Sequence, residues 1–256
     1  MLTRSLKLMR RYSLYLLALI LSACELKPGD DIFGKNNNQN DVSIWQHKDP
    51  NLIKDSISAN QQREKNKLNT AEKLLSLSLN IDVYDEFGNK IGIGSGAFIK
   101  PNIVVTNFHV IQDGYRFILT RNSDTRAFQG TVLKIDETHD IALLKITNYR
   151  TSNFLRLNSK LPRIGTNVFV AGSPEGLSGS ISNGIVSSIR KNDPYDFDLI
   201  QFTAPISMGS SGGPIINEQL ELIGITVGTN SENNAQNLNY AIPSKYISFL
   251  LDEENH

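Results

Sequence analysis

Three segments of the chain carry side chains that together can do nucleophilic chemistry. A serine, Ser211, lies in the small-residue run Gly209–Pro214. A histidine, His109, follows a hydrophobic run, and an aspartate, Asp140, comes directly before the apolar run Ile141–Ile146. A serine hydroxyl becomes an effective nucleophile when a histidine takes its proton and an aspartate orients the imidazole ring. The three side chains therefore predict acyl transfer, with Ser211 as nucleophile, His109 as base and Asp140 as orienting acid.

The small residues around Ser211 favour a tight turn that exposes the hydroxyl group and aims backbone N–H groups at one point. Glycine permits the backbone angles and the close substrate approach that such a turn requires. The N–H groups of Gly209, Ser210 and Ser211 are the candidate oxyanion hole, in which one donor contributes about 3 kcal/mol in the transition state. A Gly/Ser run by itself is more often a turn or a linker. The order His, Asp, Ser along the chain, which is that of chymotrypsin-type enzymes, favours the catalytic interpretation.

Other acids and one further histidine lie close in sequence to the predicted triad. Asp136 and Asp113 are alternative orienting acids if Asp140 does not fill that role. His139 is the neighbour of Asp140, and successive side chains of a strand point to opposite faces. His139 is therefore predicted to point away from the site as a surface histidine.

The segments around the three residues resemble those of the trypsin-like serine peptidases, and most closely the bacterial HtrA branch with its DegP- and DegS-like members. Further stretches resemble motifs of that branch in the same order along the chain: Gly94–Ile99, Ala171–Gly176, Ser182–Ser187, Leu222–Ile225 and Asn239–Pro243. The resemblance covers roughly residues 76–251. It implies peptide-bond hydrolysis through an acyl-enzyme intermediate, for which no metal and no cofactor is expected.

Two positions near the nucleophile depart from the family's usual Pro-Gly-Asn-Ser-Gly-Gly-Pro. Met208 stands at the first proline and Ser210 at the asparagine. Neither change removes a catalytic group, although both can alter the shape of the pocket. The PDZ domain typical of the family is not expected, since the sequence ends soon after the peptidase region.

The primary specificity pocket is placed by the same resemblance. In trypsin-like enzymes the residue six positions before the nucleophilic serine lies at the base of this pocket, and here that residue is Pro205, followed by Ile206. Because no acid stands there, cleavage after small or medium apolar residues is expected rather than cleavage after Lys or Arg. Ile225, Thr226 and Val227 are expected to pair with the substrate backbone as an added strand.

The elements that must position these residues are short strands. From Leu79 onward, β-rich runs alternate with turn signals, which predicts barrels or a sandwich. The predicted strands are Ile81–Tyr84, Ile91–Ile93, Ile103–Thr106, Phe117–Thr120, Thr131–Ile135, Ile141–Ile146, Val168–Ala171, Ser180–Ile189, Leu199–Thr203, Pro214–Ile216 and Leu222–Val227. The resemblance selects an all-β fold of two antiparallel six-stranded β-barrels. His109 and Asp140 then come from the first barrel and Ser211 from the second, and a short C-terminal helix begins near Pro243.

The N-terminus has the pattern of a secretory signal peptide over residues 1–23. Four basic residues precede the apolar run Leu14–Leu21, which is too short to span a bilayer comfortably. Small residues then lead to Cys24, and this ending resembles the lipobox of bacterial lipoproteins. Cys24 is therefore predicted to become the first residue of the mature protein and to carry lipid. The alternative is a plain signal peptide with an incidental cysteine. Glu25 favours sorting to the outer membrane, and so a periplasm-facing location in the cell envelope.

Residues 24–75 are polar and are predicted to form a tether, partly helical, that leads to the peptidase region at residues 76–251. This tether either makes oligomer contacts or is a solvated linker. Without the signal peptide the chain has 22 Lys and Arg against 26 Asp and Glu. It shows no basic stripe, which argues against nucleic acid as a partner. Cys24 is the only cysteine, so an intramolecular disulfide is excluded.

The favoured interpretation is a lipid-anchored serine endopeptidase that acts on envelope or unfolded proteins. Its partners would be a protein or peptide substrate, the membrane through the lipid on Cys24, and a second copy of the chain if the protein is a homo-oligomer. One alternative is a catalytically idle peptidase fold that serves as a binding or chaperone-like lipoprotein. Another is a structural lipoprotein with a long tether. Only the endopeptidase requires Ser211 for its effect.

Overall fold

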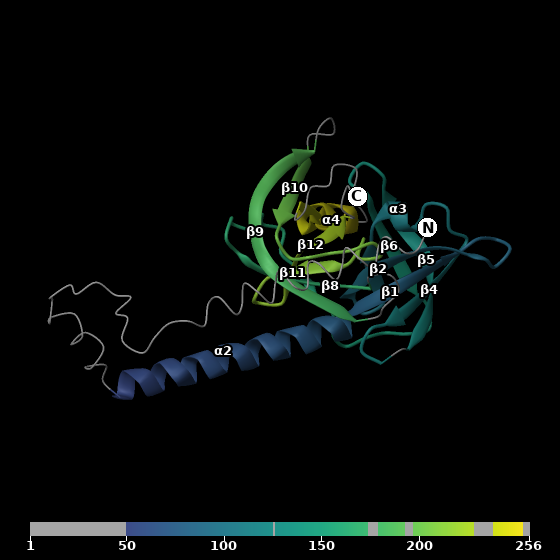
Figure 1. Cartoon of the computed structure of the whole chain (residues 1–256). Helices are drawn as coiled ribbons and strands as arrows, with labels where there is room; N and C mark the ends of the chain where they lie inside the picture. Colours follow the sequence, from purple (N-terminus) through teal and green to yellow (C-terminus); the bar gives the residue numbers. More distant parts are fainter. Residues whose placement is uncertain (1–49, 125, 174–178, 193–196, 228–237, 253–256) are drawn as a thin grey trace, which may run out of the picture. The chain divides into compact units, whose positions relative to one another are not determined.

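The computed structural model describes residues 50–124, 126–173, 179–192, 197–227 and 238–252. These residues form mostly strands, with one long helix before them and one short helix after them (Figure 1). The chain divides into two compact units, Met1–Ser56 and Ile57–His256, and the second contains every described strand. The predicted signal peptide and Cys24 lie outside the described residues.

The first six strands form a closed antiparallel barrel in the order β1-β2-β3-β6-β5-β4. They are β1 (Ser78–Tyr84), β2 (Lys90–Lys100), β3 (Ile103–Thr106), β4 (Arg116–Arg121), β5 (Ala127–Asp136) and β6 (Ile141–Ile146). Leu79, Ile81 and Val83 of β1 alternate with more polar residues and join the core inside this barrel. This alternation is the two-residue period of a strand with one face inward.

Six later strands form the second barrel in the order β11-β8-β9-β10-β13-β12, which the pairing of β11 with β12 closes. They are β8 (Asn167–Gly172), β9 (Ser180–Asn192), β10 (Phe197–Phe202), β11 (Pro214–Ile216), β12 (Glu221–Val227) and β13 (Asn239–Pro243). A short strand, β7 (Arg156–Leu157), lies parallel to β12. The prediction of two six-stranded antiparallel barrels with a short C-terminal helix is confirmed.

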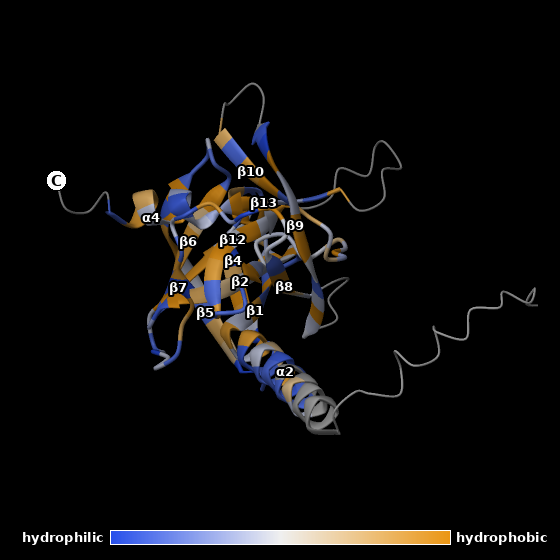
Figure 2. Ribbon diagram, turned by 90° about the vertical axis from the view of Figure 1, so that its left-hand side faces the viewer, coloured by the Kyte–Doolittle hydropathy of each residue, from blue (hydrophilic) through white to orange (hydrophobic). Residues whose placement is uncertain are grey.

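Among the residues that the structure describes, the buried apolar side chains form three clusters, one inside each barrel and one between the barrels. Neighbouring residues of one strand belong to different clusters: Leu143 of β6 packs between the barrels and Leu144 packs inside the first. Such strands have two buried faces, which explains why Ile141–Ile146 is a nearly continuous apolar run. Figure 2 shows the hydrophobic residues concentrated on the strands of both barrels. The interface between the barrels is therefore a packed core that can hold two halves of a site in register.

Two helices flank the strands. The predicted helical part of the tether forms α2 (Pro50–Leu77), whose described residues are mostly hydrophilic (Figure 2). Its last turns bury Leu74 and Leu77, whereas Leu68 is 65% exposed. α4 (Ser244–Asp252) packs into the cluster between the barrels. No helix among the described residues is both long enough and apolar enough to cross a membrane.

Candidate active site

His109 and Asp140 are held together by the pairing of two neighbouring strands. His109 lies in α3 (Phe108–Ile111), one helical turn directly after β3. Asp140 precedes β6, and β3 pairs with β6 so that Thr106 lies opposite Ala142. The Nδ1 atom of His109 lies 2.7 Å from Oδ2 of Asp140, and the backbone N–H of His109 donates to Oδ1 at 2.8 Å. The carboxylate thus holds the imidazole ring with Nδ1–H as donor, which leaves Nε2 free to act as a base.

The backbone of Asp140 is fixed in a strained conformation. Its φ is +53°, in the left-handed region that residues other than glycine rarely adopt and that aspartate tolerates better than most. The carbonyl oxygen of Asp140 accepts hydrogen bonds from the N–H of Phe108 at 3.2 Å and from Nδ2 of Asn107 at 3.0 Å. Asn107, Phe108 and His109 therefore hold both the main chain and the carboxylate of Asp140. Strained backbone that the surrounding residues hold in place is typical of functional sites.

Ser211 follows a turn whose shape depends on glycine. The N–H of Ser210 donates to the carbonyl oxygen of Ser207 at 3.0 Å, and Gly209 has a φ of +90°. A bond across four residues with positive φ at the third is the pattern of a type II turn, which favours glycine at that position. Gly209 therefore decides how the peptide groups before Ser211 are oriented.

The loop that carries Ser211 docks closely on the first barrel. The N–H of Ser95 in β2 donates to the carbonyl oxygen of Ser211 at 2.8 Å. Gly212 has a φ of +81°, and a Cβ atom there would lie 2.3 Å from Ser95 O and 2.3 Å from Thr106 Oγ1. Only glycine permits this approach. Because Thr106 ends β3, three residues before His109, the docking brings the Ser211 loop to the corner that holds the His109–Asp140 pair.

The three predicted oxyanion-hole donors differ in the structure. The N–H of Ser210 is already used in the turn to Ser207, and the Ser210 side chain is buried. Across the described part of the chain, the N–H groups of Gly209 and Ser211 have no hydrogen-bond partner. The prediction for Ser210 is corrected for this reason, because a donor spent inside the turn cannot also bind an oxyanion. Gly209 and Ser211 stay the candidate donors.

The third contact of the predicted triad is not formed. Neither the Ser211 hydroxyl nor Nε2 of His109 makes a hydrogen bond to any of the residues that the structure describes. The His109 side chain is 44% exposed, so its free nitrogen is open to solvent and to substrate. In unliganded enzymes such contacts are often long and tighten only with substrate bound. The site thus consists of a formed His–Asp pair beside a serine held by the opposite barrel.

Ile225 and Thr226, which were predicted to pair with the substrate backbone, instead bind the loop that carries Ser211. Ile225 pairs with Pro214 on one side and with Ile242 on the other. The N–H of Thr226 donates to Gly213, its carbonyl oxygen accepts from Gly212, and its hydroxyl donates to Ser210 O. Both edges of this stretch are occupied, so a substrate strand has no free backbone groups to pair with there. Only Val227, at the end of β12, stays a candidate for such pairing.

Pro205 and Ile206 line a small cavity of about 90 Å³. The other lining residues come from β8, β9 and the turn before Ser211: Val170, Gly172, Ser180, Ile181, Ser182, Ser207 and Ser210. None of the described residues that line it is acidic. The turn from Ser207 to Ser210, called the oxyanion turn below, borders this cavity, because both of these residues belong to the cavity lining. The described lining does not include Val227 at the end of β12.

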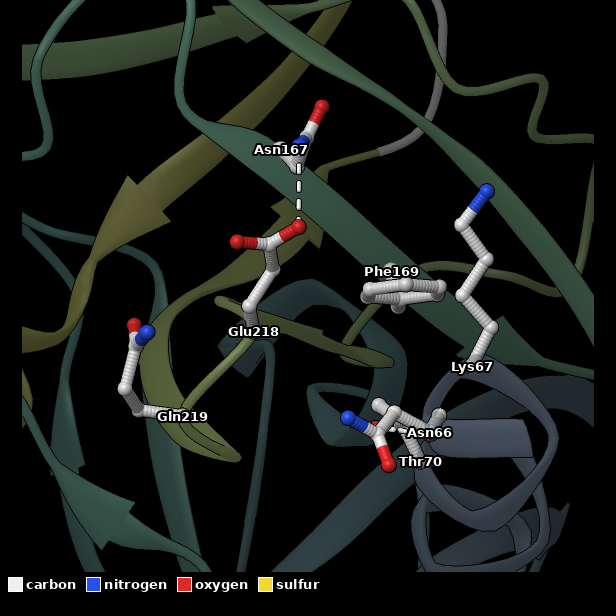
Figure 3. Close-up of a pocket in the computed structure, with 7 residues that line it drawn as sticks. All are labelled: Asn66, Lys67, Thr70, Asn167, Phe169, Glu218 and Gln219. Atoms are coloured by element: carbon white, nitrogen blue, oxygen red, sulfur yellow. Dashed lines mark hydrogen bonds between the residues drawn. The ribbon is translucent and has the colours of Figure 1, made fainter. Parts of the chain in front are cut away.

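A second cavity, polar and about 680 Å³ in volume, lies between α2, β8 and the turn from β11 to β12 (Figure 3). Its lining residues are Asn66, Lys67, Thr70, Asn167, Phe169, Glu218 and Gln219. Asn167 Nδ2 donates to Glu218 Oε1 at 2.9 Å across one side of it. Neither His109 nor Ser211 contributes to this lining, so the cavity is separate from the candidate active site.

His139 is a packed residue, and the prediction of a surface histidine is wrong. Its ring stacks on Tyr246 of α4 with centroids 4.1 Å apart, and Nδ1 lies 2.6 Å from Oδ2 of Asp136. Asp136 thereby has a partner of its own and does not orient His109. The turn before Asp140 reaches the second barrel and α4, which a pattern based on strand alternation does not reveal.

Ser95 and Thr106 contact the Ser211 loop directly and were not among the predicted site residues. Their positions in β2 and β3 become significant only when the second barrel docks on these strands. The one sequence signal for Ser95 is its place between two glycines, Gly94 and Gly96.

Comparison with known proteins agrees with this geometry. Residues 94–225 match the family described as trypsin-like peptidase domain, and this span contains all three predicted triad residues. Serine protease HTRA2, mitochondrial, from Drosophila erecta is 33% identical over 167 residues, which are 62% of this chain and 39% of the relative. The probable periplasmic serine endoprotease DegP-like of Rickettsia conorii is 31% identical over 208 residues, which are 77% of this chain and 41% of the relative.

The chain belongs to the trypsin-like peptidase family, since the matched domain covers more than half of its residues. Its relatives carry the names HTRA2 and DegP-like, in agreement with the resemblance of the sequence motifs to the HtrA branch. The chain spans less than half the length of these relatives.

Proposed function

We propose that the protein is a serine endopeptidase that uses Ser211, His109 and Asp140. The observation that carries this proposal is the His109–Asp140 pair, 2.7 Å apart, beside a loop that offers Ser211 with two uncommitted N–H groups of the described backbone. A fold reused only for binding requires none of these three side chains. The family match over residues 94–225 supports the same conclusion.

The reaction follows from the positions of these groups. Nε2 of His109 takes the hydroxyl proton as Ser211 attacks the peptide carbonyl carbon, and Asp140 stabilises the imidazolium that forms. The N–H groups of Gly209 and Ser211 bind the developing oxyanion. His109 then gives the proton to the leaving amine, and water hydrolyses the acyl-enzyme through the same groups.

We propose a preference for small or medium apolar residues before the scissile bond. Pro205 and Ile206 bring apolar surface to the cavity of about 90 Å³ that they line, and none of the described lining residues is acidic. Val227 is the residue from which a substrate strand would extend along β12. A cleavage profile measured on a peptide library tests this point, and a profile dominated by Lys or Arg would contradict it.

We propose that the protein acts in the bacterial cell envelope and is anchored by lipid on Cys24. The pattern of residues 1–23 supports this, and one relative is named as a probable periplasmic endoprotease. Metabolic labelling with a palmitate analogue tests the anchor: label is expected on the wild type and absent from Cys24→Ser. Equal labelling of both proteins would refute lipidation at this residue.

Labelling of the full-length protein with a fluorophosphonate probe tests the catalytic proposal. The wild type is expected to label, and Ser211→Ala is expected to stay folded and unlabelled. Ser159→Ala is a matched control, because it removes an exposed serine hydroxyl that bonds Ser248, outside the site, and it should label normally. A folded wild type that never labels, even with unfolded peptide present, would favour the binding or chaperone-like alternative.

A further inference from the structure

Ser95 makes more contacts with the nucleophile loop than its place in the first barrel requires. It is fully buried in β2, and its hydroxyl donates to the carbonyl oxygen of Gly209 at 2.8 Å. Its N–H donates to the carbonyl oxygen of Ser211 at 2.8 Å. Gly209 and Ser211 are the two residues whose N–H groups form the candidate oxyanion hole. One residue of the first barrel therefore binds the carbonyl groups of both donor residues.

We propose that Ser95 is a positioning residue of the active site, which fixes the oxyanion turn of the second barrel from the first. The proposal rests on the proposed peptidase function. Ser95 does not touch substrate, but it determines how the Gly209 residue is held. The carbonyl oxygen of Gly209 and the N–H of Ser210 belong to the same peptide group. Ser95 binds one end of that group and Ser207 binds the other, so the group is fixed at both ends.

The Ser95 hydroxyl is itself oriented by a donor from the second barrel. The N–H of Ser173, also fully buried, donates to Ser95 Oγ at 3.0 Å. A hydroxyl has one proton, so accepting from Ser173 leaves that proton to point at Gly209. The alternative orientation, away from Gly209, would leave a buried carbonyl oxygen without a partner, which costs free energy.

Ser173 in turn contacts the place where α2 passes into β1. Its hydroxyl donates to Oδ1 of Asn122 at 3.3 Å, and Nδ2 of Asn122 donates to Oγ of Ser78 at 2.9 Å. A continuous set of hydrogen bonds thus runs from the first residue of β1 to Gly209. Asn122 supports Ser95 indirectly, and its loss should have the weaker effect.

The test compares Ser95→Ala with Ser244→Ala in the full-length protein. Ser244 is equally buried and its hydroxyl also donates to a backbone carbonyl oxygen, that of Asn158, away from the site. Ser95→Ala is expected to lower kcat and the rate of fluorophosphonate labelling about tenfold or more, with KM within about twofold. Ser244→Ala should keep both rates within about twofold of the wild type. Equal labelling rates for Ser95→Ala and the wild type would overturn the inference.

Hydrogen exchange at the N–H of Ser210 gives a second readout that does not need activity. This N–H closes the turn, so its exchange should become faster in Ser95→Ala and stay unchanged in Ser244→Ala. If the wild type does not label, the peptidase proposal fails, and unchanged exchange in Ser95→Ala separately overturns the role of Ser95.

If Ser95→Ala does not fold, the rate of fluorophosphonate labelling of Asn122→Ala tests the inference in its place. This substitution should slow labelling about two- to tenfold. If folded Asn122→Ala labels as fast as the wild type, the proposed role of these hydrogen bonds in positioning the oxyanion turn is refuted.

Discussion

Replacing Gly209 by alanine should separate the shape of the oxyanion turn from the rest of the site. Gly209 has a φ of +90°, and a left-handed backbone costs a residue with a side chain about 1–2 kcal/mol. The variant can relieve this strain by rotating the peptide group between Met208 and residue 209. The turn would then change from type II to type I, which has a negative φ at its third residue. The rotation moves the N–H of residue 209 out of the oxyanion hole.

The expected loss follows from removing one of two donors. One oxyanion-hole donor contributes about 10²–10³ in kcat, so Gly209→Ala should lower kcat by about 100-fold or more. The free energy of unfolding should fall by only about 1 kcal/mol, because rotation relieves part of the strain. Peptide cleavage under saturating substrate gives kcat, and denaturant titration gives the stability.

Gly165→Ala is the matched control for this experiment. Gly165 has a φ of +87°, and no atom lies within 4 Å of the place that a Cβ atom would take, so the substitution brings the same backbone strain in open space. It should lose similar stability and keep its kcat within about twofold. The reasoning would be refuted if Gly209→Ala kept more than a tenth of the wild-type kcat, or if both variants lost activity equally.

Asp140→Asn should lower kcat about 10⁴-fold while the protein stays folded, because an amide cannot hold the His109 ring with Nδ1–H as donor; a loss below tenfold would exclude Asp140 as the orienting acid. Gly212→Ala should cost about 3 kcal/mol of stability, since its Cβ would lie 2.3 Å from two oxygen atoms, and a calorimetric melting temperature equal to the wild type's would contradict the docked loop. The hydrogen bond from Lys245 lowers the pKa of Asp198 below its usual 3.8. A lowered folded-state pKa adds stability above the unfolded value, and that stability is lost as the pH falls through the folded value. Lys245→Met should therefore lose less stability than the wild type between about pH 5 and pH 2; equal losses in the two proteins would refute this linkage.

The chemistry-bearing residues could be predicted because each has a distinctive local sequence. The glycines around Ser211 and the apolar run after Asp140 reflect requirements that act within a few residues: positive φ values, a tight turn and a strand with two buried faces. The repeated short strands predicted only barrels or a sandwich, and the resemblance to the trypsin-like peptidases selected two barrels. The sequence patterns around Ser211 and after Asp140 can be recognised locally, although the close approach at Gly212 and the second buried face of Ile141–Ile146 arise only when the barrels pack together.

The errors at His139 and Thr226 arose where a long-range contact overrode a local rule. His139 follows strand alternation in the sequence, yet it packs on Tyr246, more than a hundred residues later. Thr226 was predicted to offer free backbone groups to a substrate strand, but its N–H and carbonyl group are bonded to the Ser211 loop. Ser210 was predicted as a third oxyanion-hole donor, but its N–H donates to the carbonyl oxygen of Ser207, three residues earlier.

The sequence by itself determined the candidate nucleophile, base and acid, the glycines of the turn and the sets of strands, because short-range backbone and burial preferences depend on neighbouring residues. Only the tertiary structure decided which N–H groups stay uncommitted and which buried hydroxyl holds the oxyanion turn. Ser95 and Gly209 are 114 positions apart. Their hydrogen bond exists because two separately closed barrels pack face to face, and no local pattern encodes the register between them.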